Sequence, residues 1–187
     1  MVAATRRATI ADLDAMPDDG RRYELISGEI FVAAAPNWQH QFTSRAIFRL
    51  LDAWVQQRAL GEAMFAPFDI LLNDETIVEP DVFVLTHANL PNLRSGRFHG
   101  APDLAVEVVS PTNRDHDMVT KMFRYAQNGV REYWLIDPAT RAVLILSLID
   151  GIYVPQKAND QGHYASVVLL GLLIDPEAIF IPIDSAS

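Results

Sequence analysis

The 187-residue sequence contains no cysteine, which excludes disulfide bonds and thiolate metal ligands and suits a reducing compartment. It also lacks any apolar run close to the roughly 20 residues that a membrane-spanning helix needs. The first residues do not contain the apolar segment of a signal peptide. Together these absences predict a cytoplasmic protein with no membrane partner.

Positive charge is scarce as well, because 15 lysines and arginines are set against 24 acids and the net charge is −9. An acidic chain is a poor nonspecific binder of nucleic acid. Only two of the basic residues are lysines, Lys121 and Lys157, so arginine supplies the ordinary surface charge. Five acids and no base lie between Asp69 and Asp81, a cluster typical of a solvated turn, a cation site or both.

The composition that is present is that of a folded globular protein, with 50% hydrophobic and 21% charged residues. The length suits one domain with a substantial core and is short for two. No internal repeat, linker or low-complexity segment divides the chain. We therefore predict a single domain over residues 1–187.

The most informative stretch is residues 104–109, which are apolar on both faces except at Glu107 and so predict a strand covered on both sides. A carboxylate in such a strand is costly unless it is paired, hydrogen-bonded or bound to a cation. An amphipathic helix follows, capped by Ser110 or Thr112. Lys121 borders the sheet-facing side of this helix and is a candidate partner of Glu107, although a boundary lysine often extends its ammonium group into water.

The other elements are predicted from hydrophobic periodicity and turn residues. Helices are expected at 9–16 and 39–59, and strands at 22–32 (two strands turned at Ser27–Gly28), 63–72, 77–85, 132–138, 141–148, 151–155 and 167–170, with a helical turn at 174–180 and a long connection at 86–102. Glu24 lies in the first strand, where it is compatible with an ordinary exposed position. His40 lies in the first turn of the long helix, where capping or surface exposure also explains it.

Asp81 and Glu107 are expected to lie close together. Asp81 opens the strand 77–85 and Glu107 lies near the end of 104–109, so antiparallel pairing of these strands makes the two carboxylates neighbours. Adjacent carboxylates repel each other unless a proton or a cation lies between them. Oxygen ligands without cysteine favour a hard cation such as Mg²⁺ or Mn²⁺ over zinc.

Several segments resemble the Uma family of restriction-endonuclease-like proteins, long grouped as a domain of unknown function, within the PD-(D/E)XK nucleases. The segments are Arg22-Tyr-Glu-Leu-Ile-Ser-Gly-Glu29, His40, Ala66-Pro-Phe-Asp69, Glu79-Pro-Asp-Val82, Asp103-Leu-Ala-Val-Glu-Val-Val-Ser-Pro111, Lys121 with Tyr125, and Gly129-Val-Arg-Glu-Tyr-Trp-Leu-Ile-Asp-Pro138. The resemblance implies an α/β (α+β) fold with a restriction-endonuclease-like core at about 39–137. In this fold a mixed central sheet is flanked by helices and carries an N-terminal hairpin and a C-terminal β extension.

The resemblance also implies roles for individual residues. Asp81 and Glu107 correspond to the metal-binding acids, and Glu24 and His40 are further candidate site residues. The nuclease pattern places a lysine two residues after the glutamate, where this sequence has Val109. Lys121 is our candidate for the displaced lysine.

Two functions are compatible with these features. The first is a Mg²⁺-dependent endonuclease that hydrolyses phosphodiester bonds in DNA, with Asp81, Glu107 and Lys121 as its catalytic residues. The second is a non-catalytic binding or assembly protein that keeps the fold and a structural or vestigial metal site. Val109, the acidic net charge and the lack of an evident DNA-reading module favour this alternative.

A homodimer is also expected, because cutting both strands of a duplex is simplest with two active sites. The apolar segments 143–148 and 167–173 are candidate interfaces, although both are compatible with core strands.

Overall fold

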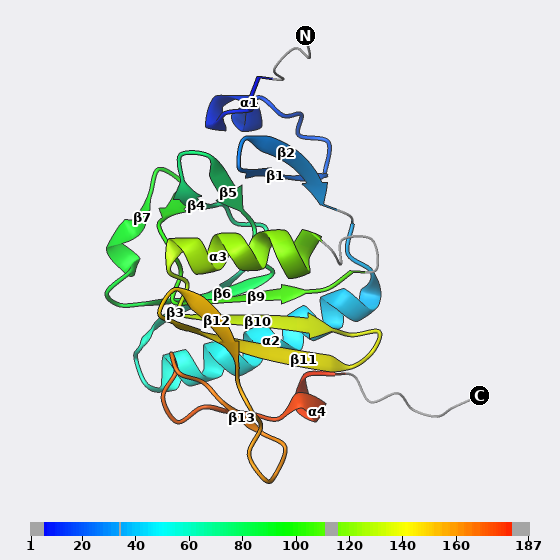
Figure 1. Ribbon diagram of the computed structural model, residues 1–187, viewed down its shortest axis with the longest axis vertical. Helices are drawn as coiled ribbons and strands as arrows, with labels where there is room; N and C mark the ends of the chain where they lie inside the picture. Colours follow the sequence, from blue (N-terminus) through cyan, green and yellow to red (C-terminus); the bar gives the residue numbers. More distant parts are fainter. Residues whose placement is uncertain (1–5, 34, 111–115, 181–187) are drawn as a thin grey trace, which may run out of the picture.

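The computed structural model describes residues 6–33, 35–110 and 116–180, and in this part it contains two six-stranded sheets, a small two-stranded sheet and four α-helices (Figure 1). The first sheet has the order β2 (Glu29–Ala33), β1 (Arg22–Ile26), β5 (Thr76–Val78), β4 (Ile70–Asn73), β8 (Arg97–His99), β7 (Leu93–Arg94). The second has the order β12 (Ile152–Pro155), β11 (Ala142–Ile149), β10 (Glu132–Asp137), β9 (Leu104–Val108), β6 (Val82–Thr86), β3 (Gly61–Phe65). The helices are α1 (Ile10–Asp14), α2 (Trp38–Gln57), α3 (Met122–Asn128) and α4 (Pro176–Ile179), and β13 (Tyr164–Ala165) pairs with β14 (Leu173–Ile174). This α+β architecture agrees with the predicted fold class.

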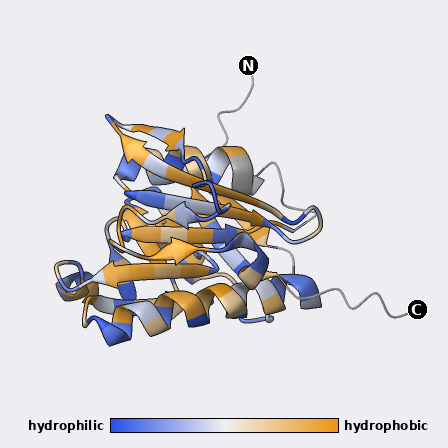
Figure 2. Cartoon of the chain, turned by 90° about the horizontal axis from the view of Figure 1, so that it is seen from below, coloured by the Kyte–Doolittle hydropathy of each residue, from blue (hydrophilic) through white to orange (hydrophobic). Residues whose placement is uncertain are grey.

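The second sheet lies between α2 and α3, and its strands are hydrophobic along most of their length (Figure 2). On one face, Ile47 and Leu51 of α2 pack with alternate strand residues such as Val106. On the other face, Tyr125 of α3 packs with residues such as Ala105. Alternate residues of β9 therefore enter two different cores, which explains why this strand has no hydrophilic face. No helix in the described ranges is both long and apolar enough to cross a membrane.

The pairing of β6 with β9 determines the position of the two predicted acids. The strands are antiparallel, and Val82 is opposite Val106. Asp81 and Glu107 are therefore the next residues outward on their strands, at the same end of the pair. The antiparallel arrangement predicted for these strands is confirmed.

Two predicted strands are each divided in the structure. The predicted strand 63–72 becomes β3 and β4, and 77–85 becomes β5 and β6. The pair β4–β5 belongs to the first sheet and the pair β3–β6 to the second, so each predicted strand is divided between the two sheets. The breaks fall at Pro67 and Pro80, which have no N–H group to donate to a continuous ladder. The chain consequently crosses between the two sheets immediately before Asp81.

The prediction of a strand at 167–170 is wrong. These residues form a turn, because the buried Glu132 carboxylate accepts hydrogen bonds from the backbone N–H groups of Val167 and Val168, at 2.7 and 2.9 Å. The Ser166 hydroxyl donates to the same carboxylate oxygen at 2.8 Å. N–H groups that a strand would donate to its neighbour are thus bound by a side chain.

Most of the remaining predictions are confirmed. Thr9 caps α1 with a reciprocal capping box, and Ser27 and Gly28 turn β1 into β2 with positive φ angles of 55° and 79°. The helix after β9 begins as one π-helical turn (His116–Lys121) and continues as α3, which ends at Gly129 in a left-handed conformation. The cap predicted at Thr112 lies outside the described residues.

The connection predicted at 86–102 contains a 3₁₀ turn (Leu90–Asn92) and the short β7–β8 hairpin, which joins β4 in parallel. Asp103, which directly follows this connection, fixes its position through side-chain hydrogen bonds. Its carboxylate accepts hydrogen bonds from the Thr86 backbone at 2.7 Å, the Asn89 amide at 2.9 Å and the Arg131 guanidinium at 2.7 Å.

Replacing Asp103 with asparagine is expected to lower the free energy of unfolding by about 1–3 kcal/mol at neutral pH. Burial raises the pKa of this carboxyl, but the three hydrogen bonds outweigh it and hold the pKa below the ordinary value of 3.8. The stabilisation is therefore complete above pH 3.8 and is lost as the pH falls through the lower pKa of the folded state. Urea denaturation of both proteins measures the effect. A stability difference that persisted unchanged well below pH 3.8 would contradict this account.

Candidate functional site

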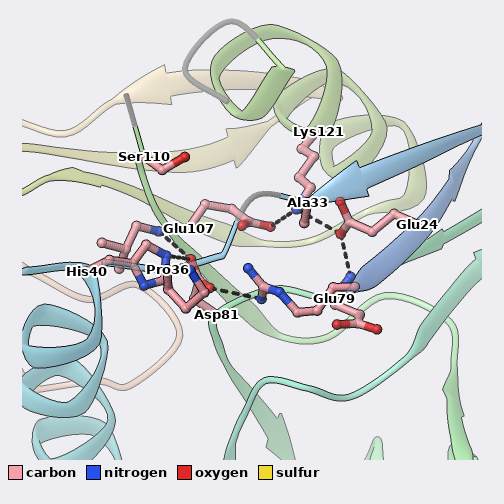
Figure 3. Close-up of a pocket in the computed structure, with 11 residues that line it drawn as sticks. Glu24, Ala33, Pro36, His40, Glu79, Asp81, Glu107, Ser110 and Lys121 are labelled. Carbon is pink, nitrogen blue, oxygen red and sulfur yellow. Dashed lines mark hydrogen bonds and ion pairs between the residues drawn. The ribbon is translucent and has the colours of Figure 1, made fainter. Parts of the chain in front are cut away.

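A small cavity of about 20 Å³ lies where the two sheets meet the first turn of α2 and the turn before α3 (Figure 3). Its charged and titratable lining residues come from widely separated parts of the chain. They are Arg22, Glu24, His40, Glu79, Asp81, Glu107 and Lys121. The cavity combines four carboxylates with an arginine, a lysine and a histidine, and has room for a single water molecule or ion.

Asp81 is held from three directions. Its Oδ2 accepts a hydrogen bond from the Val108 backbone N–H at 2.8 Å and lies 3.1 Å from His40 Nε2, while Oδ1 lies 3.4 Å from the Arg22 guanidinium. Burial raises the pKa of Asp81, but the hydrogen bond and charge of His40, with the charge of Arg22, hold it below 3.8. The carboxylate is therefore ionised and fixed in position at neutral pH.

Glu107 also lines the cavity and contacts two residues of the helical segment that follows β9. Its Oε1 accepts hydrogen bonds from Lys121 Nζ at 3.1 Å and from the Tyr125 hydroxyl at 2.8 Å. Lys121 also forms an ion pair with Glu24 Oε1 at 2.8 Å, so its ammonium lies between the two glutamates (Figure 3). Lys121 is buried, and the alternative in which its ammonium reaches bulk water is wrong.

Glu79 completes the acidic wall of the cavity. Its backbone N–H donates to Glu24 Oε1 at 2.7 Å. Burial, followed by the nearby charges of Asp69 and Glu24, raises the pKa of its side chain to about 7. Its Oε2 atom is buried and has no hydrogen-bond partner among the described residues. The Glu79 carboxyl is therefore only partly ionised at neutral pH.

All five residues singled out in the sequence, Glu24, His40, Asp81, Glu107 and Lys121, line this one cavity. The ordinary interpretations of two of them are wrong: Glu24 is 3% exposed rather than an exposed strand residue, and His40 is 6% exposed rather than a surface residue. Their roles in chemistry stay predictions.

Sequence reasoning missed Arg22 and Glu79. Arg22 is two residues before Glu24 on β1, and residues at that spacing point to the same face of a strand. Glu79 belongs to the acidic cluster that ends at Asp81. The spacing of Arg22 from Glu24 and the acidic cluster around Glu79 are both visible in the sequence. Without the fold, neither pattern distinguishes a residue of a site from a charged residue on the surface.

The carboxylate oxygens of the cavity fit a hard cation whose remaining ligands are water and substrate phosphate. No group of three or more His, Cys, Asp or Glu side chains in the described ranges is placed to hold a metal ion. Mg²⁺ is commonly bound by only one or two carboxylates together with water and substrate phosphate. Asp81 and Glu107 supply two such carboxylates at the cavity.

Comparison with known proteins gives two findings. Residues 10–177 match the family model described as "Uma2: Putative restriction endonuclease". Among solved structures, the chain is similar to one from Anabaena variabilis described as "a putative nuclease belonging to DUF820", with 17% sequence identity and a TM-score of 0.77 over 92% of this chain and 97% of that chain. A search of curated proteins gave no significant match. At this identity the structural similarity establishes the fold alone, and it confirms the expected nuclease-like fold.

Proposed function

The chain belongs to the family described as "Uma2: Putative restriction endonuclease", and we propose that it hydrolyses phosphodiester bonds in DNA with Mg²⁺ or Mn²⁺ bound at Asp81 and Glu107. The observation that carries the proposal is the position of Lys121. Its ammonium lies 3.1 Å from Glu107, on the wall of the cavity that Asp81 also lines. Two carboxylates and a buried lysine at one cavity match the residue types that metal-assisted phosphoryl chemistry uses.

In the proposed reaction, the negative and the positive side chains of the cavity have different roles. A bound divalent cation supplies a Lewis acid that polarises a phosphate oxygen and lowers the pKa of a water molecule. Asp81 and Glu107 provide the negative charge that attracts such a cation. Lys121 supplies a fixed positive charge beside them, which stabilises negative charge that develops on a phosphate or orients the attacking water. His40 and the Val108 backbone hold Asp81 in one orientation.

The departure from the nuclease pattern is consistent with this assignment. Val109 occupies the position of the usual lysine and is packed in the core with Tyr125 and Val130. Lys121 instead reaches the cavity from the turn before α3. The basic group thus comes from the next element, because the helix packs directly against the strand that carries Glu107.

The non-catalytic alternative is favoured by a different observation. Asp81 and Glu107 contact cationic side chains of the chain itself, Arg22 and Lys121 respectively. Carboxylates whose charge is balanced by the chain's own arginine and lysine can serve as a structural element without binding a metal ion or catalysing a reaction. The two functions predict different responses to divalent cations.

We expect saturable binding of Mg²⁺ or Mn²⁺ to the wild-type protein and a loss of at least tenfold in affinity in the Glu107→Gln variant, because the variant removes one of the two ligand charges. Isothermal titration calorimetry measures this, with Glu62→Gln, an exposed glutamate outside the cavity, as the matched control. The titration is repeated with a non-cleavable oligonucleotide present, since a phosphate completes the proposed coordination. No binding under either condition would contradict the nuclease proposal and support the alternative.

We also propose a homodimer, so that two sites reach both strands of a duplex. Of the two candidate interface segments, 143–148 is partly core, since Ile145 and Leu146 are buried. The segment 167–173 exposes Leu170 at 78% and is the better candidate.

A further inference from the structure

A long groove of about 990 Å³ opens directly beside the cavity and runs along α2. It shares Arg22, His40 and Asp81 with the cavity, so a ligand that lies in the groove reaches the proposed metal site. The proposed function makes no use of this surface beyond the shared residues. Its other lining residues come mainly from α2 and from the segment around Phe65 and Pro67.

The groove is lined by aromatic rings that the core does not use. Trp38 is 62% exposed, Phe65 58% and Phe42 38%. Trp38 and Phe42 meet edge to face with ring centroids 6.1 Å apart, and Phe65 meets Phe48 in the same manner at 4.7 Å. Two aromatic pairs therefore line one open groove, in which Trp38, Phe42 and Phe65 are exposed and Phe48 also packs against the core.

Positive charge accompanies these rings, although the chain as a whole carries −9. Arg21, Arg22, Arg45 and Arg49 line the groove, against Asp81 as its one acid among the described lining residues. The Arg45 guanidinium lies over the Phe42 ring, 4.7 Å from its centroid. Neither Arg45 nor Arg49 has an ion-pair partner within the described part of the chain.

The order of these residues on α2 is regular. Trp38, Phe42, Arg45 and Arg49 are separated by four, three and four residues, which places them on one face of the helix. At 1.5 Å per residue this face is about 16 Å long, the length of roughly four or five stacked nucleotides at about 3.4 Å each. Its Trp38 end adjoins His40, which contacts Asp81.

We infer that this groove binds single-stranded nucleic acid, with bases stacked on the aromatic rings and phosphates held by Arg45 and Arg49. Exposed rings followed by arginines along one helix face suit an unpaired strand, because every base has a face to stack and every nucleotide carries a phosphate. In a duplex those faces are already covered by neighbouring bases. If the groove binds the strand that is cut, the scissile phosphate belongs to an unpaired or locally opened strand. This consequence rests on the proposed function.

The test measures binding without chemistry. A fluorescein-labelled oligo-deoxythymidine is titrated with protein in EDTA, and its fluorescence anisotropy is followed at several salt concentrations. Trp38→Ala is expected to weaken binding about 5- to 150-fold, the usual loss of one base–aromatic stack. The Arg45→Gln/Arg49→Gln double variant should reduce the slope of log affinity against log salt by about 1.4, because two phosphate contacts are lost.

Two matched controls keep the result specific to the groove. Phe123→Ala removes an aromatic ring that is 53% exposed on α3, and Arg94→Gln removes an exposed arginine of β7; neither residue lines the groove. Both controls should bind as the wild type does. Equal losses in the controls, or tighter binding of a duplex than of the single strand, would overturn the inference.

A second copy of the chain is the competing occupant of the groove. Sedimentation that shows a dimer dissociated by Trp38→Ala would assign the groove to that interface and overturn the inference. The result is separable from the proposed function. Strand binding without any cleavage would contradict the nuclease proposal alone, whereas cleavage of a duplex without single-strand binding would contradict the groove inference alone.

Discussion

The Asp81→Asn and Glu107→Gln variants are each expected to lose metal-dependent cleavage by about 10²- to 10³-fold or more while remaining folded. Each change replaces a carboxylate by an amide of nearly the same shape, so that the ligand charge is lost and the packing is kept. In Asp81→Asn the remaining carbonyl oxygen still accepts a hydrogen bond from the Val108 N–H group, which Asp81 now binds at 2.8 Å. Folding should therefore survive with a cost of no more than about 3 kcal/mol.

Cleavage is measured with single-stranded and duplex DNA in Mg²⁺ and in Mn²⁺, and folding by circular dichroism and urea denaturation. Asp74→Asn is the matched control, since Asp74 is an exposed acid in the β4–β5 turn of the same acidic cluster and does not line the cavity. The control should cleave as the wild type does. Wild-type protein that cleaves neither substrate, or variants as active as the control, would refute the assignment of these two acids.

Lys121→Met is expected to have the largest effect on stability, about 3–5 kcal/mol. The substitution leaves the buried Glu24 and Glu107 side by side without the ammonium that both contact at 2.8 and 3.1 Å. Two buried negative charges then repel each other, and one of them must take up a proton. Urea denaturation measures the loss. The Lys121→Arg variant keeps the charge and should lose less.

The double variant Lys121→Met/Glu24→Gln separates the structural from the chemical role of the lysine. It removes one of the two carboxylates together with the lysine, so we expect much of the lost stability to return. If Lys121 acts on the phosphate or the water, kcat of the folded double variant stays well below that of Glu24→Gln alone, which accounts for any role of Glu24 itself. Recovery of kcat together with stability would show that Lys121 only neutralises its two glutamates.

The elements of the fold were largely predictable because their signals are local. The capped helix α1, the turn at Ser27–Gly28 and the strand β10 follow from caps, turn residues and apolar runs of a few neighbouring residues. The division of the strands at Pro67 and Pro80 was locally visible too, but it was not predicted, because a proline at a strand end and a proline between two sheets look alike in sequence. The turn at 167–170 depends on Glu132, more than thirty residues earlier in the chain, and no local pattern reports it.

The candidate site divides in the same way. Glu107 could be identified from the sequence by itself, since a carboxylate in an otherwise apolar strand requires compensation wherever that strand lies. Its position near Asp81 followed from one assumption, the antiparallel pairing of their two strands, which the structure confirms. The burial of Glu24, His40 and Lys121, the nearness of Arg22 and Glu79, and the groove along α2 were decided by the tertiary structure. These contacts join residues up to about a hundred positions apart, and only the packing of two sheets and two helices determines which charged side chains lose their access to water.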